Sequence, residues 1–336
     1  MSAHGKSFHQ EETQIMSKQP PAKALQSGFL PCVGCGKDME LNSFAPLSIT
    51  PCPSCGTQNF IPQKIKDYWL YEPLGGGGMG SVYHAFLEHD PEIELAVKIL
   101  PRQRKNEAFL IQALLCEARI GYHFGDHPHL VKIIDMGYSD GEYFEAMEYV
   151  EGIRLDRIIE SPVKRPEKQI LLWALQILSA EQHMFEKGYL FRDLKPQNII
   201  IDNNGNVKLF DFGLAITLEE ALNLQSDEIQ GSPHYIPPER IVGAGESLCS
   251  EIYSLGMLLF HMLARQTYYS SAELELLMAK HVTALRVGNV AGKLPSETNQ
   301  DIVRVLNRMI NRTPRERYQT YCAAAADLMR IYKMSA

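Results

Sequence analysis

The stretch Phe191-Arg192-Asp193-Leu194-Lys195-Pro196-Gln197-Asn198 lies in the second half of the sequence, and Asp211-Phe212-Gly213 begins 13 residues after Asn198. Together they place carboxylates, an amide and a lysine in one short part of the chain. Carboxylate and amide oxygens are ligands that suit Mg²⁺, and fixed positive charges neutralise phosphate oxygens during phosphoryl transfer. The pattern therefore indicates a site that handles phosphate together with a metal ion.

A glycine-rich segment precedes this stretch. Leu74-Gly75-Gly76-Gly77-Gly78-Met79-Gly80-Ser81-Val82 contains the pattern G-x-G-x-x-G-x-V at Gly75, Gly77, Gly80 and Val82. Glycines at such positions let backbone amides approach phosphate oxygens without a Cβ in the way. The segment lies between two predicted strands and does not open a helix, which argues against a dinucleotide site.

A lysine and a glutamate that could pair with each other follow the glycine-rich segment. Ala96-Val97-Lys98 ends a predicted strand, and Glu117 lies 19 residues further on, in a predicted helix, where it could hold the lysine ammonium. Taken alone, a lysine at the end of an apolar run is equally well a solvated residue at a sheet edge. Pro237-Pro238-Glu239 comes after the other motifs. Their order and spacing are hard to obtain by accident.

The set of motifs resembles the eukaryotic-type protein kinase family, over the region from about Tyr68 to Lys333. Lys195 and Gly231-Ser232-Pro233-His234-Tyr235 are similar to the serine/threonine branch of that family. The resemblance implies an ATP-dependent kinase that transfers the γ-phosphate to Ser or Thr hydroxyls of protein substrates. Autophosphorylation is a further hypothesis.

The resemblance also implies roles for individual residues. Asp193 would accept or orient the proton of the attacking hydroxyl, and Lys195 would neutralise the γ-phosphate. Lys98, oriented by Glu117, would bind the α- and β-phosphates. The implied ligands of Mg²⁺, for which Mn²⁺ could substitute, are Asn198 and Asp211.

An adenine pocket follows from the same resemblance. The implied nucleotide-binding residues are Gly75, Gly77, Gly80, Val82, Ala96, Lys98, Met147, Glu148, Val150, Asn198, Ile200 and Asp211. Met147 would lie at the back of the pocket, and Glu148–Val150 would form the hinge between two lobes. Val82 and Ala96 would cover one face of the ring, and Ile200 the other. Plain core packing would also explain the apolar members of this set.

Two residues depart from the family pattern. Phe191 replaces a histidine and would stack beneath Phe212, since aromatic rings pack favourably. Glu251 stands where the family has an aspartate that accepts hydrogen bonds from the backbone of the catalytic loop. These changes keep a second hypothesis open, a pseudokinase scaffold that binds nucleotide with little or no transfer. Arg317 matches an arginine that pairs with Glu239 in the family.

The segment Asp211–Glu239 offers three hydroxyls for phosphorylation, on Thr217, Ser226 and Ser232. Arg192, beside Asp193, suggests a basic pocket for a phosphorylated residue of this segment. For Ser232, a hydrogen bond to the catalytic loop is an equally good explanation.

Two CxxC pairs, Cys32-Val33-Gly34-Cys35 and Cys52-Pro53-Ser54-Cys55, are separated by 16 residues, and each is followed by a glycine. Four thiolates in such pairs suit tetrahedral Zn²⁺, and this region resembles a zinc ribbon with a structural metal. Redox-active or disulfide-linked pairs are the alternative. The predicted zinc ligands are Cys32, Cys35, Cys52 and Cys55. The remaining cysteines, expected to be small buried hydrophobes, are Cys116, Cys249 and Cys322.

The order of the elements predicts an α+β fold of two lobes behind a small zinc ribbon. The expected parts are a disordered tail (1–28), a zinc-ribbon-like module (29–64) and a kinase domain (65–334) with an N-lobe at 65–148 and a C-lobe at 152–334. The predicted strands are 68–74, 81–87, 94–100, 129–138 and 143–149, with a hairpin joining 198–201 to 207–210. The predicted helices are 108–124, 167–187, 250–263 and 300–310.

The net charge and the distribution of apolar residues limit the kinds of partner and the cellular location that we expect. The formal net charge is −7 and no long basic run occurs, so no nucleic-acid partner is expected. No apolar run approaches the roughly 20 residues of a membrane-spanning helix. The first residues lack the apolar core of a signal peptide, so we expect a cytoplasmic, reducing environment. The expected partners are protein substrates with Ser or Thr, and a partner protein at the zinc ribbon.

Overall fold

The computed structural model describes residues 19–77, 80–223, 230–283 and 290–335. The chain divides into two units, each with its own packing. The first unit consists of Met1–Leu110 and Gly137–Tyr149, and the second of Ile111–Met136 and Val150–Ala336.

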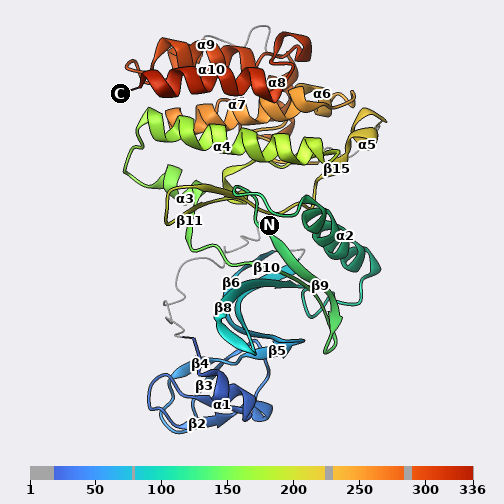
Figure 1. The fold of residues 1–336 in the computed structure, drawn as a ribbon, viewed down its shortest axis with the longest axis vertical. Coiled ribbons are helices and arrows are strands. Elements are labelled where there is room, and N and C mark those ends of the chain that lie inside the picture. The colour runs from blue at the N-terminus through green and yellow to red at the C-terminus, as the bar shows by residue number, and fades with distance from the viewer. Residues whose placement is uncertain (1–18, 78–79, 224–229, 284–289, 336) are drawn as a thin grey trace, which may run out of the picture. The chain divides into compact units, whose positions relative to one another are not determined.

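A six-stranded sheet with the order β5-β6-β7-β8-β10-β9 forms the main part of the first unit (Figure 1). Its strands are β5 (Gln63–Ile65), β6 (Tyr68–Gly77), β7 (Gly80–Leu87), β8 (Asp90–Ile99), β9 (Ile133–Ser139, its first four residues in the second unit) and β10 (Glu142–Glu148). All five predicted strands of this region are present. The largest shifts are four residues: β8 begins at Asp90, before the predicted start at 94, and β9 begins at Ile133, after the predicted start at 129.

The register of the sheet determines which residues share a face. Val82 on β7 lies opposite Lys98 on β8, and Ala96 on β8 lies opposite Met147 on β10. Directly paired residues, and residues two apart on one strand, point to the same side of a sheet. These four side chains therefore share one face. The residues between them on β8 and β10, such as Val97, are buried on the other face.

The cysteine-rich module packs on this sheet. It contains helix α1 (Ala22–Gln26), strands β1 (Phe29–Pro31), β2 (Asp38–Glu40), β3 (Ile49–Pro51) and β4 (Gln58–Phe60), and the 3₁₀ turn η1 (Leu41–Ser43). Two hairpins, β1-β2 and β3-β4, each carry one CxxC pair in the turn. The module and strands β6 and β7 share one hydrophobic cluster, made of Leu25, Leu30, Cys32, Met39, Cys52, Ile61, Trp69, Tyr71 and Phe86.

The expectation of a disordered tail over 1–28 is wrong for its last part. Residues 22–26 form α1, and Leu25 is only 2% exposed because it packs in the shared cluster. Pro21 directly precedes the helix, where its missing N–H interrupts no helical hydrogen bond. Its fixed φ also suits the backbone at the start of a helix. So short a helix is stabilised by tertiary packing. Residues 1–18 of the predicted tail lie outside the described part of the chain.

Helices dominate the second unit (Figure 1). They are α2 (Ala108–Phe124, its first three residues in the first unit), α3 (Leu155–Glu160), α4 (Glu167–Glu186), α5 (Leu218–Asn223), α6 (Pro238–Ile241), α7 (Leu248–Ala264), α8 (Leu274–Thr283), α9 (Gln300–Met309) and α10 (Tyr321–Met334). Helix α4 packs against α7 and α10, and α9 packs against both α7 and α10. The four predicted helices are confirmed as α2, α4, α7 and α9, with ends that differ by at most two residues.

Short strands and turns surround the motif residues of the second unit. They are β11 (Gly152–Arg154), β12 (Tyr189–Leu190), β13 (Ile199–Asp202), β14 (Val207–Leu209), β15 (Ile216–Thr217), and the 3₁₀ turns η2 (Pro196–Asn198), η3 (Val290–Lys293) and η4 (Pro314–Glu316). The predicted hairpin is confirmed, since β13 and β14 pair antiparallel. The loop between β12 and β13 therefore has both ends fixed by strand pairing.

In the described part of the chain, no helix combines the length and the apolar character needed to cross a membrane.

Candidate functional site

The carboxylate of Asp193 is the centre of the site in the second unit. It is buried, at 6% exposure, in the loop between β12 and β13. Its Oδ2 accepts hydrogen bonds from Lys195 Nζ at 2.6 Å and from Asn198 Nδ2 at 3.0 Å. Its Oδ1 accepts one from Ser232 Oγ at 3.1 Å. Four predicted residues thus meet at one carboxylate, and charge-assisted bonds of this kind fix its orientation.

Two residues beside the motifs have a left-handed backbone. Arg192 and Asp211 both have φ 68°, a conformation that costs a residue with a Cβ on the order of 1 kcal/mol. Both are held there by neighbouring groups. The backbone N–H of Arg192 donates to Glu251 Oε2 at 3.1 Å, and the N–H of Gly213 donates to Asp211 Oδ1 at 3.4 Å. The predicted contact of Glu251 with the backbone of this loop is therefore confirmed.

Phe212 anchors the second motif in the core. Its ring meets Phe191 edge-on, with centroids 6.1 Å apart, and Phe124 of α2 at 5.2 Å. The expected packing of Phe191 against Phe212 is confirmed. Glu117 on α2 lies close by, because a Cβ at Gly213 would come within 3.4 Å of its Oε2. Helix α2 and the Asp211 motif are thus packed directly on each other.

Arg192 already has an acidic partner. Its side chain is 3% exposed and pairs with Glu246 at 3.0 Å, and Arg240 pairs with the other oxygen of Glu246. Arg240 also donates to the carbonyl of Arg192 at 2.7 Å. Burial, with Arg240 next to it, lowers the pKa of Arg192. The interpretation of Arg192 as an open pocket for a phosphorylated residue is therefore wrong for this conformation, in which a carboxylate fills that place.

The three hydroxyls that the sequence offers for phosphorylation in the segment Asp211–Glu239 differ in their surroundings. Ser232 makes the predicted bond to the loop that carries Asp193, since its hydroxyl donates to the Asp193 carboxylate. Thr217 bonds to Glu220 of α5 through both its N–H and its hydroxyl. Ser226 lies outside the described residues.

The first unit carries the other predicted residues. Val82, Ala96, Lys98 and Met147 share one face of the sheet, as the register shows. Gly75 lies opposite Val82 on the neighbouring strand β6, and Gly77 pairs with Gly80. Glycine is required at position 80, because a Cβ there would lie 2.7 Å from the carbonyl oxygen of Ile99. The glycine-rich hairpin can therefore approach β8 closely.

A stacked pair that sequence reasoning missed adjoins the predicted hinge. Tyr149, next to Glu148, stacks on His84 of β7 with ring centroids 3.8 Å apart. His84 also accepts or donates a 2.9 Å hydrogen bond with Tyr71, which belongs to the cluster shared with the cysteine module. The pairing register places His84 beside Ala96, which in turn pairs with Met147, two residues before Tyr149. Knowledge of this register would have been needed to predict the stacked pair.

The predicted residues are therefore distributed over both units. Asp193, Lys195, Asn198, Asp211 and Glu117 lie in the second unit, with Ile200 on β13 and Val150 at the unit's boundary. Lys98, Met147, Glu148 and the glycines lie in the first. Within each unit the structure gathers them as described above.

The four cysteines of the CxxC pairs form one cluster, with all four sulfurs within 4.8 Å of one another. Sγ of Cys32 is 3.6 Å from that of Cys55, and Sγ of Cys35 is 3.9 Å from that of Cys52. A tetrahedron with Zn–S bonds of 2.3 Å has edges of roughly 3.8 Å. The donor set and its spacing thus fit a tetrahedral metal ion.

Backbone groups around the cluster also favour thiolates. The N–H groups of Gly34 and Ser54 each lie 3.4 Å from a sulfur, of Cys32 and Cys52 respectively. Burial raises the pKa of Cys32, but the backbone and Asn59 hydrogen bonds prevail and lower it to about 6. At Cys35 the backbone hydrogen bond of Lys37 lowers the pKa, but the neighbouring thiols and burial prevail and raise it to about 11. This N–H···S pattern is expected around metal-bound thiolates, which must be deprotonated.

The prediction that the three other cysteines are buried is correct for one of them and wrong for two. Cys249 is buried, but Cys116 and Cys322 are exposed. On α2 the buried positions include Leu110, Leu114 and Ala118, so Cys116 points away from that face.

A buried ion pair joins α6 to the turn before α10. Both terminal nitrogens of Arg317 donate to Glu239, at 2.7 and 2.9 Å, which confirms the predicted pair. The arginine side chain is fully buried, and Glu239 also accepts from Ser250 at 2.7 Å. The pair fixes the end of the segment that carries Ser232.

Replacing Arg317 by methionine should lower the free energy of unfolding by about 3–5 kcal/mol, because it leaves a buried carboxylate without its counterion. The measurement is denaturant unfolding. Arg315 is exposed two residues earlier, so Arg315→Met is the matched control, expected within about 0.5 kcal/mol of wild type. Equal stability of the two variants would contradict the assigned role of the pair.

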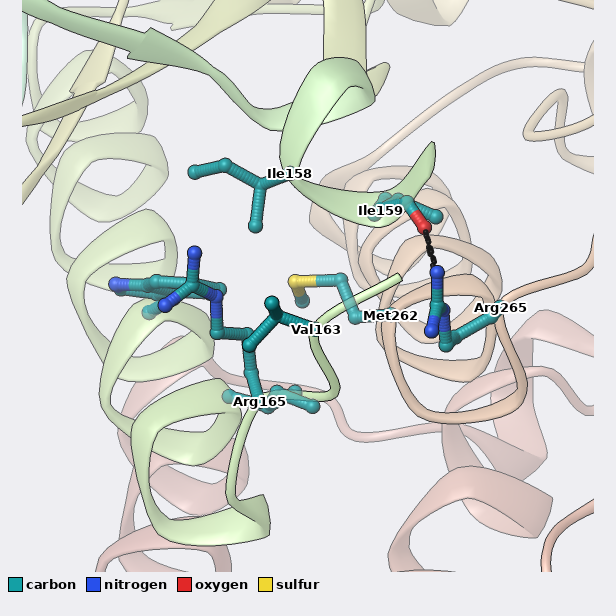
Figure 2. A pocket seen from close by; sticks show the side chains of 8 residues that line it. Ile158, Ile159, Val163, Arg165, Met262 and Arg265 are labelled. Carbon is teal, nitrogen blue, oxygen red and sulfur yellow. Dashed lines mark hydrogen bonds between the residues drawn. The ribbon is translucent and has the colours of Figure 1, made fainter. Parts of the chain in front are cut away.

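A separate pocket in the second unit is too small for a substrate. Its volume is about 10 Å³, room for no more than one water molecule. Figure 2 shows Arg265 at its edge, donating to the carbonyl oxygen of Ile159. It is lined by Ile158, Ile159, Val163, Arg165, Ile170, Trp173, Met262 and Arg265, none of which belongs to the predicted site.

Comparison with known proteins agrees with the motifs. Residues 68–329 match the model of the protein kinase domain. Serine/threonine-protein kinase PrkC of Bacillus subtilis is 32% identical over 264 residues, which is 78% of this chain and 40% of PrkC. Serine/threonine-protein kinase PknB of Mycolicibacterium smegmatis is 30% identical over 289 residues, 81% of this chain and 44% of PknB. The chain thus spans less than half the length of these two relatives.

The sheet-rich first unit and the helical second unit fit a two-lobed kinase fold. The match begins after the cysteine module, extends over parts of both units and includes every motif from the glycine-rich hairpin to Arg317. The chain therefore belongs to the protein kinase family.

Proposed function

We propose that the chain is an ATP- and Mg²⁺-dependent protein kinase that phosphorylates Ser and Thr hydroxyls of protein substrates. The observation that carries the proposal is the buried carboxylate of Asp193, oriented by Lys195, Asn198 and Ser232. A carboxylate fixed in this way can accept the proton of an attacking hydroxyl. The curated relatives, named serine/threonine kinases, support the same activity.

Each charged group has a chemical role in this proposal. Lys195, at 2.6 Å from Asp193, would balance negative charge on the transferred phosphate. The amide nitrogen of Asn198 donates to Asp193, which leaves its carbonyl oxygen to bind Mg²⁺ together with Asp211. The bound metal would supply neutralisation of the phosphate oxygens. Lys98 would bind the α- and β-phosphates.

The nucleotide would bind on the face of the first unit's sheet that carries Val82, Ala96, Lys98 and Met147. Val82, Ala96 and Met147 lie on it and would line the adenine pocket, and Glu148 follows Met147 on the same strand. The space around Gly75 fits a hairpin that lies over the phosphates, since no atom of the described residues would lie within 4 Å of a Cβ there.

The test is transfer of labelled γ-phosphate from Mg-ATP to a generic basic protein and to the chain itself. Label on phosphoserine and phosphothreonine, absent without divalent metal, is the expected result. Absence of label from wild-type protein that still binds nucleotide would favour the pseudokinase scaffold.

We also propose that the cysteine module is a zinc ribbon with a structural role in the first unit. Its ligands would be Cys32, Cys35, Cys52 and Cys55, whose sulfurs cluster at tetrahedral spacing. Four protein thiolates leave no open coordination position, so the metal would not act in catalysis. The module's contact with Trp69, Tyr71 and Phe86 supports a role in stabilising the sheet.

A further inference from the structure

A buried carboxylate joins two arginines from different segments of the second unit. Glu246 lies between α6 and α7 and is 2% exposed. Arg192 approaches its Oε1 with Nε at 3.1 Å and Nη2 at 3.0 Å. Arg240 of α6 approaches its Oε2 with Nε at 2.8 Å and Nη2 at 2.6 Å. Both arginine side chains are buried, and buried charges are costly unless they are paired, so the three groups constrain one another.

The backbone of Glu246 is fixed independently of its side chain. Its N–H donates to the carbonyl of Ala221 on α5 at 2.9 Å. The next residue, Ser247, is the N-cap of α7 and forms a capping box with Ser250. Such a cap stabilises the start of a helix. The carboxylate is therefore held at a rigid point of the fold, outside the segment Asp211–Glu239.

Arg192 is held at three places, and the residue after it is Asp193. Its N–H donates to Glu251 at 3.1 Å, its carbonyl accepts from Arg240 at 2.7 Å, and its side chain binds Glu246. Its left-handed φ of 68° costs free energy and persists only where the surroundings enforce it. Two of the three contacts depend on Glu246, directly or through Arg240. The carboxylate therefore helps to fix the backbone that carries Asp193.

Arg240 also contacts the segment that carries Ser232. Its Nη1 donates to the carbonyl of Gln230 at 3.4 Å. A Cβ at Gly231 would lie 2.8 Å from this Nη1, so the backbone of the segment lies directly against the guanidinium. Ser232 follows and donates to Asp193. The carboxylate that orients Arg240 thus supports the Asp193 carboxylate from two sides, through the loop before it and through the segment that bonds to it.

A phosphorylated residue of the segment Asp211–Glu239 would compete for the same arginines. Phosphoryl groups order such segments by binding arginine side chains. Here a carboxylate already binds both guanidinium groups, and displacing it would leave its own charge buried without a partner. Of the candidate hydroxyls in the described residues, Thr217 bonds to Glu220 and Ser232 bonds to Asp193. The contacts around the arginines are therefore complete without a phosphate.

We propose that Glu246 is a positioning residue for the catalytic loop, and that phosphate transfer needs no prior phosphorylation of the segment Asp211–Glu239. The inference rests on the proposed kinase activity and concerns its regulation. Glu246 acts through Arg192 and Arg240, which it holds in the orientation that fixes the backbone before Asp193. Its loss would let that backbone shift, and small displacements at a phosphoryl-transfer site are costly.

The first test compares two samples of the wild-type protein. One is treated with a phosphatase until mass spectrometry finds no phosphate in residues 211–239, and the phosphatase is then removed. The other is incubated with Mg-ATP. Transfer of labelled γ-phosphate to a generic basic protein should begin without a lag in the treated sample, with the same kcat as in the other. A lag, or a kcat more than about twofold higher after incubation with Mg-ATP, would overturn the proposal.

The variant Glu246→Gln tests the carboxylate itself. It keeps the size of the side chain but replaces one oxygen by an amide nitrogen, which cannot accept a hydrogen bond from a guanidinium. We expect kcat to fall about tenfold or more, with KM for ATP within about twofold of wild type. Glu219 is exposed on α5, so Glu219→Gln is the matched control, expected to behave as wild type. Equal kcat for the two variants would overturn the role of Glu246.

Hydrogen exchange gives a readout that needs no activity. The N–H of Arg192 is bonded to Glu251, and the peptide that contains it should exchange about tenfold or more faster in Glu246→Gln than in Glu219→Gln. A peptide of α10, which takes no part in these contacts, should exchange equally in both variants. Equal exchange at Arg192 would overturn the positioning role. Faster exchange in both peptides alike would show a general loss of stability and would overturn it too.

These outcomes separate the inference from the proposed function. If wild type transfers no phosphate in either sample, the proposed function fails, and the exchange rates then decide the positioning role of Glu246 alone. If Glu246→Gln does not fold, the comparison of the two wild-type samples still decides whether transfer needs a phosphorylated segment.

Discussion

Asp193→Asn should lower the rate of phosphate transfer by about 10²–10⁴-fold, the range for loss of a general base. Asparagine keeps the size of the side chain and an oxygen that Ser232 can donate to, so the loop should remain folded. It cannot accept the proton of the hydroxyl. It also removes the negative partner of Lys195, now at 2.6 Å. The measurement is initial rate with Mg-ATP and a generic basic protein, with the melting temperature recorded in parallel.

The same substitution nine residues further on gives a matched control. Asp202 accepts the N–H groups of Asn204 and Asn206 in the turn after β13, through one oxygen that asparagine retains. Asp202→Asn should therefore transfer phosphate at the wild-type rate. Transfer by Asp193→Asn within a few-fold of this control would refute the assigned role of Asp193. Loss of transfer with retained folding would leave the scaffold hypothesis without support.

Local sequence signals predicted the elements that carry the motifs. Apolar runs between glycine-rich turns indicated β6 and β7, and helical spacing gave the bounds of α2, Ala108–Phe124, without error. The contacts of Phe191, Glu251 and Arg317 were also predictable, because each occupies a position with one structural task in the kinase family. Such signals depend on residues close in sequence or on a fixed motif order.

Contacts between distant segments left no such signal. The cluster that joins Leu25 to Trp69 and Phe86 combines three segments, and nothing local marks them as partners. The stack of His84 on Tyr149 is of the same kind.

Cys52→Ser should unfold the cysteine module and remove its zinc, since structural zinc in small modules contributes on the order of 10–16 kcal/mol. Cys52 is buried in the cluster that also contains Trp69, which is only 7% exposed. Loss of the module would expose Trp69 to water and shift its fluorescence emission to longer wavelength. The chain has one other tryptophan, Trp173, which donates to the carbonyl of Gly205 within the second unit, so a Trp173→Phe background isolates the signal.

The matched control is Cys322→Ser, because Cys322 is exposed on α10 and outside the cluster. Zinc content by elemental analysis should be about one per chain in wild type and in this control, and near zero in Cys52→Ser. Chelation of wild type should reproduce the emission shift, and re-adding zinc should reverse it. Full zinc content in Cys52→Ser would refute the four-thiolate site. Zinc loss without an emission shift would show that the sheet keeps its packing without the metal, and would overturn the structural role proposed for the ribbon.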